Sequence, residues 1–245
     1  MARYVPRALS VHVSSDRRPS ALDPVLRQAG GVLVMHGGHA VVAHYGSAAG
    51  ELAACVSAVG LADRSDLAKL VLEGPPAQLQ QLTQRLTGSD VAPGGAVLSG
   101  GAWWCAESPE RMLVISEVSR GDHLHAVLRA RVARRSAVTL TDRSAELAAL
   151  AVVGRRARAL LAELGVYGET GNPRHVPPLT AHTGAGAEVL WLLESDDKAL
   201  ALMAAADGPA VWHAVERAGH RFGLCSVGQE ALARYALIRR IASPI

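Results

Sequence analysis

The sequence predicts an α+β fold that contains a duplicated strand–helix unit, and three observations lead to this class. Strand-like apolar runs and helical patterns follow one another at irregular intervals, which favours α+β over a doubly wound parallel sheet. The Asp-Arg-Ser sequence of residues 63–65 recurs at residues 142–144, and each copy precedes an apolar strand, a glycine and a leucine-rich helix. The 245 residues are 49% apolar, which is enough for one large domain or two intertwined ones.

Residues 1–20 differ from the rest of the chain. They carry several arginines but no apolar signal core, so we expect a flexible arm and no secretion. Elsewhere no uncharged apolar run approaches the roughly 18–20 residues that a membrane-spanning helix needs. We therefore expect a cytoplasmic protein without a membrane partner, whose folded region covers residues 21–245.

Caps and turn residues predict the first elements. Ser47 is a natural helix N-cap, and apolar residues then recur at helical spacing as far as Gly60, which we expect to end the helix. Asp63 and Ser65 can bond their own backbone in a tight turn. The other expected elements here are a short helix at Pro24–Gln28, a strand at Val32–Met35, a turn at residues 36–39, a loop from His39 and a strand at Leu67–Leu72.

Glycine and proline residues mark the boundaries between the elements expected in the rest of the chain. Gly74 and the two prolines after it end a strand and start a helix, because proline suits the first helical turn. The proline-rich residues 170–178 are the clearest internal boundary between two intertwined subdomains. We expect strands at Ala96–Leu98, Ala102–Ala106, Arg111–Ser116, Leu147–Val153, Leu179–His182 and Glu188–Leu193, and helices from Pro76 to Gly88, at 121–133, before Gly165, at Gly208–Ala218 and from Gly228 to Ala242.

A family resemblance begins at residues 45–65, YGSAAGELAACVSAVGLADRS. A tyrosine before a helix, a Gly-Leu pair closing it and an Asp-x-Ser turn occur at this spacing at the start of glycine-cleavage T-protein (aminomethyltransferase) sequences. The resemblance continues to about residue 240, and the wider group includes the gamma subunit of heterotetrameric sarcosine oxidase. It implies a T-protein-like folate-binding fold with tetrahydrofolate or a one-carbon derivative as cofactor. T-protein sequences continue into a C-terminal β-barrel that is absent here, so we expect an uncovered face and a homo-oligomer or hetero-complex.

The resemblance also implies binding residues. Thr183 and Gly184 begin a segment that looks like the family's Tyr-Thr-Gly-Glu-x-Gly-x-Glu, shortened by one residue, and Glu188 falls on the glutamate that holds the pterin. One carboxylate can accept both N–H groups of a pterin edge, as it does from arginine. The alternative is that Glu188 is a surface strand residue. Trp103, Trp104 and Ile115 are assigned to strands that line the pterin pocket. Adjacent tryptophans on a strand point to opposite faces, so at most one can stack on a ligand, and core packing is the alternative for both.

Several family positions are changed. The place of the catalytic aspartate falls at residues 100–101, which are glycines, and the family's Ala-Arg-Asp becomes residues 229–231, Gln-Glu-Ala. The histidine after Tyr-Gly-Ser is Leu52. Tyr45 can supply a hydroxyl near the site, and Glu117, where the family commonly has asparagine, is the nearest candidate for a new acid or base.

Sequence motifs of other common catalytic, nucleotide-binding and metal sites are absent. The sequence contains no GxSxG, HExxH, GxGxxG or GxxxxGK[ST] pattern. Three widely spaced cysteines argue against a disulfide framework or a zinc site, and His36, His39 and His44 lack a fourth ligand, so no metal is expected. The arginines of residues 155–158 favour a solvated surface, with a landing site for an anionic tail as the alternative. Aromatic residues are not interleaved with them, so nucleic-acid binding is not expected.

Two functions from different classes follow. The first is a diverged folate-dependent one-carbon transferase that acts on a small-molecule substrate, with folate as its other partner. The second is a non-catalytic, folate-fold subunit of a larger oxidase or transferase complex, like the sarcosine oxidase gamma subunit. The glycines at residues 100–101 favour the second, and Glu188 together with the tyrosine-led helix favours the first.

Overall fold

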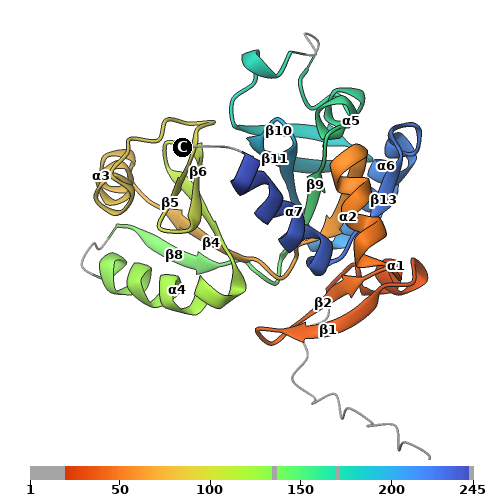
Figure 1. Cartoon of the computed structure of the whole chain (residues 1–245). Coiled ribbons are helices and arrows are strands. Elements are labelled where there is room, and N and C mark those ends of the chain that lie inside the picture. Colours follow the sequence, from red (N-terminus) through yellow and green to blue (C-terminus); the bar gives the residue numbers. More distant parts are fainter. Residues whose placement is uncertain (1–19, 134–136, 169–171, 243–245) are drawn as a thin grey trace, which may run out of the picture.

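The computed structural model describes residues 20–133, 137–168 and 172–242. The arm expected over residues 1–20 therefore lies, apart from Ser20, outside the described residues. In chain order the elements are α1 (Asp23–Gln28), β1 (Val32–His36), β2 (His39–His44), α2 (Ala48–Ser57), β3 (Val59–Asp63), β4 (Ala68–Glu73), α3 (Pro76–Thr87), β5 (Ala96–Ser99), β6 (Ala102–Ser108), β7 (Arg111–Ser116), α4 (Val118–Val132), β8 (Thr139–Asp142), β9 (Leu147–Val153), α5 (Ala157–Glu163), β10 (Leu179–Gly184), β11 (Ala187–Ser195), β12 (Lys198–Ala204), α6 (Gly208–Gly219), β13 (Leu224–Ser226) and α7 (Gln229–Ala242), with short 3-10 helices at Pro173–His175, Ala205–Asp207 and His220–Phe222 (Figure 1).

The strands form two sheets and a separate hairpin, and the class is α+β as predicted. The six-stranded sheet has the order β10-β11-β12-β9-β3-β13, and the five-stranded sheet has the order β5-β6-β7-β4-β8. β3 pairs in parallel with β13 and antiparallel with β9, and the other neighbours in both sheets are antiparallel. β1 and β2 form the hairpin, turning at Gly37 and Gly38, which both have positive φ.

Successive side chains on a strand point to opposite faces of the sheet, and the buried side chains form three cores. On β9, Leu150 and Val152 face an outer core that α1, α5 and α6 complete, whereas Ala151 and Val153 face a central core. The central core lies between the two sheets and includes residues of α2 and α7. A third core packs the other face of the five-stranded sheet against α3 and α4. The result is two sheets with helices outside, and α7 lies between the two halves (Figure 1).

The predicted repeat is confirmed, and its two copies cross. Each copy runs from an Asp-Arg-Ser turn through a strand and a glycine into a helix, β4 to α3 and β9 to α5. In each turn the serine N–H donates to the aspartate Oδ1 at 2.9 Å. Ser65 Oγ then accepts from Ala149 N at 3.1 Å in the other copy, and Ser144 Oγ accepts from Lys69 N at 2.9 Å. Each copy therefore supplies a hydrogen-bond partner that the other lacks.

The chain changes sheets at these two crossings. It leaves the six-stranded sheet after β3, builds the five-stranded sheet, and returns with β9. Residues 172–178, in the segment where the sequence predicts an internal boundary, connect α5 to β10 of the six-stranded sheet. In the described ranges no helix is long and apolar enough to cross a membrane.

Two local predictions around α2 are wrong. Ser47 caps the helix as expected, because its Oγ accepts from Gly50 N at 3.2 Å, but α2 ends at Ser57 and not at Gly60. Gly60 lies in β3, where an added Cβ would be 2.8 Å from Cys55 Sγ, so the glycine permits close packing of strand on helix. The segment His39–His44, expected as a loop, is strand β2.

Candidate functional site

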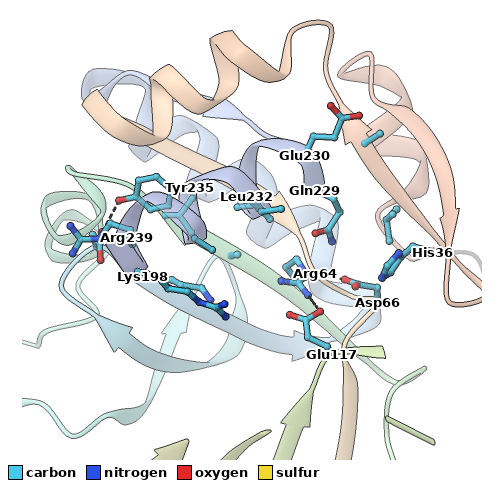
Figure 2. Close-up of a pocket in the computed structure, with 18 of the residues that line it drawn as sticks. His36, Arg64, Asp66, Glu117, Lys198, Gln229, Glu230, Leu232, Tyr235 and Arg239 are labelled. Atoms are coloured by element: carbon cyan, nitrogen blue, oxygen red, sulfur yellow. Dashed lines mark hydrogen bonds and ion pairs between the residues drawn. The ribbon is translucent and has the colours of Figure 1, made fainter. Parts of the chain in front are cut away.

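A cavity of about 1040 Å³ opens between α7, the β1–β2 hairpin and the central face of the six-stranded sheet. Its lining side chains include Ala151 from β9, Ala43 from β2, and Ala233 and Ala236 from α7. Because alanine fills little volume, α7 crosses the sheet without filling the space beneath it. The volume is at the upper end of the range for small-molecule sites. Charged side chains gather at two ends of this central cavity (Figure 2).

The first end contains Arg64, Asp66 and Glu117. Arg64 and Asp66 belong to the crossing between β3 and β4, and Glu117 directly follows β7. Arg64 Nε donates to Asp66 Oδ1 at 3.1 Å, and Arg64 Nη2 donates to Glu117 Oε2 at 2.7 Å. Burial acts to lower the pKa of Arg64, but the two carboxylates outweigh it and raise that pKa above its ordinary value. Arg64 is therefore a permanent cation that orients both acids.

The second end is organised by Asp197 in the β11–β12 turn. Its Oδ2 accepts from the Tyr235 hydroxyl at 2.6 Å and pairs with Arg239 Nε at 2.6 Å. Burial raises the pKa of Tyr235, and the bond to Asp197 adds to this, so the phenol keeps its proton. Lys198 lies at the same end and pairs with Glu194 at 2.8 Å. These contacts attach α7 to the sheet and place two cations at the cavity wall.

Lys69 is buried next to the first end. Its Nζ donates to the backbone carbonyls of Ser65 at 2.9 Å and Leu67 at 2.8 Å. Burial lowers the pKa of Lys69 to about 8, although the carboxylates of Asp66 and Asp63 act in the opposite direction. The crossing of the two repeats thus contains a buried amine whose charge the fold tolerates poorly.

The two predicted catalytic residues do not lie together. Glu117 lines the cavity, and its side chain is 54% exposed. Tyr45 does not line it: the ring packs against the outer core, and its hydroxyl is buried without a hydrogen-bond partner among the described residues. Burial, and then the charge of Asp63, raises the pKa of Tyr45. The structure therefore leaves Glu117 as the one member of this pair beside the cavity.

The predicted binding residues also lie outside the cavity lining. Trp104 is buried in the third core, between the five-stranded sheet and helices α3 and α4, and Ile115 is buried in the central core. Trp103 packs against the central core and donates from Nε1 to Glu194 Oε2 at 3.2 Å, so the tryptophans do take opposite faces. Thr183 and Glu188 are exposed partners on the β10–β11 hairpin, and Gly184 is the last residue of β10 before the turn.

Sequence reasoning missed Asp66, Asp197, Tyr235 and Arg239 as cavity residues. One sequence feature could have indicated Asp66: it directly follows the Asp-Arg-Ser turn that the sequence analysis identified. Tyr235 and Arg239 are four residues apart on one side of α7, a spacing that only predicts neighbours on a helix. Among the residues that the structure describes, no group of three or more His, Cys, Asp or Glu side chains is placed to hold a metal ion.

Comparisons with known proteins identify the fold. No family model matches the sequence. No curated protein matches it either. Aminomethyltransferase T of the glycine cleavage system from Bartonella henselae superposes with a TM-score of 0.71 at 16% identity, over 86% of this chain and 59% of that one. A chain of heterotetrameric sarcosine oxidase from Corynebacterium sp. U-96 superposes with a TM-score of 0.61 at 18% identity, over 86% of this chain and 98% of that one. The chain thus has a T-protein-like fold, and its match spans about three-fifths of the aminomethyltransferase.

Proposed function

We propose that this chain, with its T-protein-like fold, binds a reduced folate in the central cavity and acts as a folate-fold subunit of a larger oxidase or transferase complex. The observation that carries the proposal is the cavity itself, which pairs apolar walls with charged groups at two ends. A reduced folate has matching parts: a polar pterin, an aromatic linker and a carboxylate tail. Bound there, it would supply one-carbon carrier chemistry.

The residues present fit such a ligand. Arg239 and Arg240 of α7 and Lys198 of β12 line the second end, where a carboxylate tail would find cations. Leu232 on α7 and Val41 on β2 offer apolar contact to an aromatic linker. A cytoplasmic location is part of the same proposal.

The first test is a calorimetric titration of the purified chain with 5-formyltetrahydrofolate. We expect saturable one-to-one binding that weakens when Arg239 and Arg240 are both replaced by glutamine, because the tail loses two cations. The matched control replaces Arg129 and Arg131, which lie on α4 and do not line the cavity. A chain that binds no folate at millimolar ligand would contradict the proposal.

A subunit role is favoured by exposed apolar side chains on α7 and at the cavity wall. Leu237 and Ile241 on α7 are 59% and 76% exposed, and Met35 and Leu98 at the cavity wall are 53% and 58% exposed. Apolar surface of this kind usually marks an interface. The match over 98% of a chain from a heterotetrameric oxidase supports the same role.

The role predicts that the isolated chain associates. Light scattering at micromolar concentration should give a mass above the 25.6 kDa of one copy. The double variant Leu237→Glu, Ile241→Glu should lower the measured mass to that of a single copy. The control pair Glu146→Gln and Arg217→Gln changes exposed polar residues away from α7. A parent chain that stays at one copy throughout would argue against self-association and leave only a second kind of chain as partner.

Catalytic one-carbon transfer is the second candidate, and Glu117 is the observation in its favour. Its carboxylate lines the cavity and is half-exposed, so it can reach a bound molecule. Transfer of a one-carbon unit that disappears in Glu117→Gln, with folate affinity retained, would make this role the better one.

A further inference from the structure

Asp66 presents a buried carboxylate oxygen that nothing in the described chain satisfies. Its side chain is 2% exposed, and Oδ1 accepts from Arg64 Nε at 3.1 Å. Oδ2 has no hydrogen-bond partner among the described residues. An unsatisfied buried acceptor destabilises the folded state, and more so when it is charged, so such atoms are rare in folded proteins.

The neighbouring donors are already engaged. Arg64 is divided between Asp66 and Glu117, and the Lys69 ammonium donates to two backbone carbonyls. Neither cation reaches Oδ2 within hydrogen-bond distance. Asp66 is part of the lining of the central cavity, together with His36 and Gln229 (Figure 2). Asp66 also lines a smaller neighbouring pocket beside Ser65, so of the two spaces that it borders the central cavity is the larger, and a molecule bound there can supply the missing donor.

The other acids of the cavity are less suited to this task. Glu117 is half-exposed and Glu230 is exposed, so water can satisfy both. Asp197 already accepts from Tyr235, Arg239 and Ser195. Glu188, which the family resemblance assigns to the pterin, is exposed on β11 and does not line the cavity. Asp66 alone among these carboxylates combines burial with an unused oxygen in the cavity wall.

We propose that Asp66, and not Glu188, accepts the N–H donor edge of the bound heteroaromatic ring. This inference rests on the proposed function and assigns the ligand's orientation: the amino-pyrimidine edge lies at the Arg64–Asp66 end and the carboxylate tail at the Arg239 end. The required ligand class is a ring that carries an exocyclic amine beside a ring N–H. The ionised oxygen accepts one strong, charge-assisted hydrogen bond from it.

The experiment measures dissociation constants of 5-formyltetrahydrofolate and of 6-methyltetrahydropterin, which has the edge but no tail. Asp66→Asn turns an acceptor into a donor that faces a donor, and should weaken both ligands by about 10- to 100-fold. Glu188→Gln is the matched control and should leave both within about twofold, because an exposed charge away from the ring contributes little. The urea midpoint of each variant is measured in parallel.

A modified ligand tests the same contact without any change to the protein, in case Asp66→Asn does not fold. The parent should bind the 2-desamino analogue of 6-methyltetrahydropterin about 10- to 100-fold more weakly than the pterin itself. If folate binds but Glu188→Gln loses affinity, or Asp66→Asn and the analogue lose none, the assignment to Asp66 is overturned and folate binding stands. If the parent binds neither folate nor pterin, both the assignment and the proposed function are overturned.

Discussion

Replacing Gly228 by alanine is expected to lower the free energy of unfolding by about 3–5 kcal/mol. Gly228 precedes α7, and an added Cβ would clash with the backbone of Ala43 and lie 2.6 Å from His44 N. Backbone atoms in β2 cannot move aside as a flexible side chain can. The Gly228 N–H also donates to Glu51 Oε2 at 2.8 Å inside the protein, and displacement of the chain would break this bond. Since β2 and α7 form two walls of the cavity, folate affinity should fall as well.

Urea unfolding followed by circular dichroism measures this effect. Gly50→Ala is the matched control, because its added Cβ would meet nothing closer than Ser47 Oγ at 3.5 Å. In helix α2 that change should be neutral or stabilising by up to about 1 kcal/mol. A Gly228→Ala protein with the midpoint of the parent would mean that α7 does not approach β2 this closely.

Lys69 should give stability an unusual dependence on alkaline pH. Burial lowers its pKa in the folded protein to about 8 from 10.5, so between these values the unfolded chain binds a proton that the folded chain has released. Stability rises with pH wherever the unfolded state binds more protons. The contribution of Lys69 should therefore increase by on the order of 3 kcal/mol from pH 7.5 to pH 10.5.

The measurement is the difference in unfolding free energy between the parent and Lys69→Met across this range. Buried tyrosines and cysteines with raised pKa act in the opposite direction as pH rises, and they cancel in the difference because both proteins contain them. Lys198→Met is the matched control, since Lys198 is the only other lysine of the chain and its side chain is 41% exposed. A difference between parent and Lys69→Met that stays flat with pH would contradict a buried, weakly charged Lys69.

Short-range chemistry explains what the sequence predicted well. The Ser47 cap, the two Asp-x-Ser turns and the Pro76 helix start each depend on residues within a few positions of one another. The repeat was visible because its copies share these signals. Strand β2 was missed because its short, continuous apolar run, Ala-Val-Val-Ala between two histidines, was interpreted together with the turn before it.

The cavity depended on contacts that no local pattern encodes. Arg64 pairs with Glu117 across 53 positions, and Asp197 pairs with Tyr235 across 38. The resemblance indicated Glu188, yet the shortened hairpin turns at Ala185 and Gly186, both with positive φ, and sets Glu188 opposite Thr183 at an exposed end. A carboxylate's identity can thus be read from the sequence while its environment cannot.

The crossing of the two repeats has a consequence for synthesis on the ribosome. β3 is made early, but its neighbours are β9 and β13, and the last of these begins only at Leu224. The serine-to-backbone bonds at the crossing likewise join positions 75 and 84 residues apart. Pairings of such high contact order form slowly, because a long loop must close before any contact offsets its entropy. The nascent chain therefore carries unpaired strand edges for most of its translation, and such edges favour aggregation until their partner strands have been made.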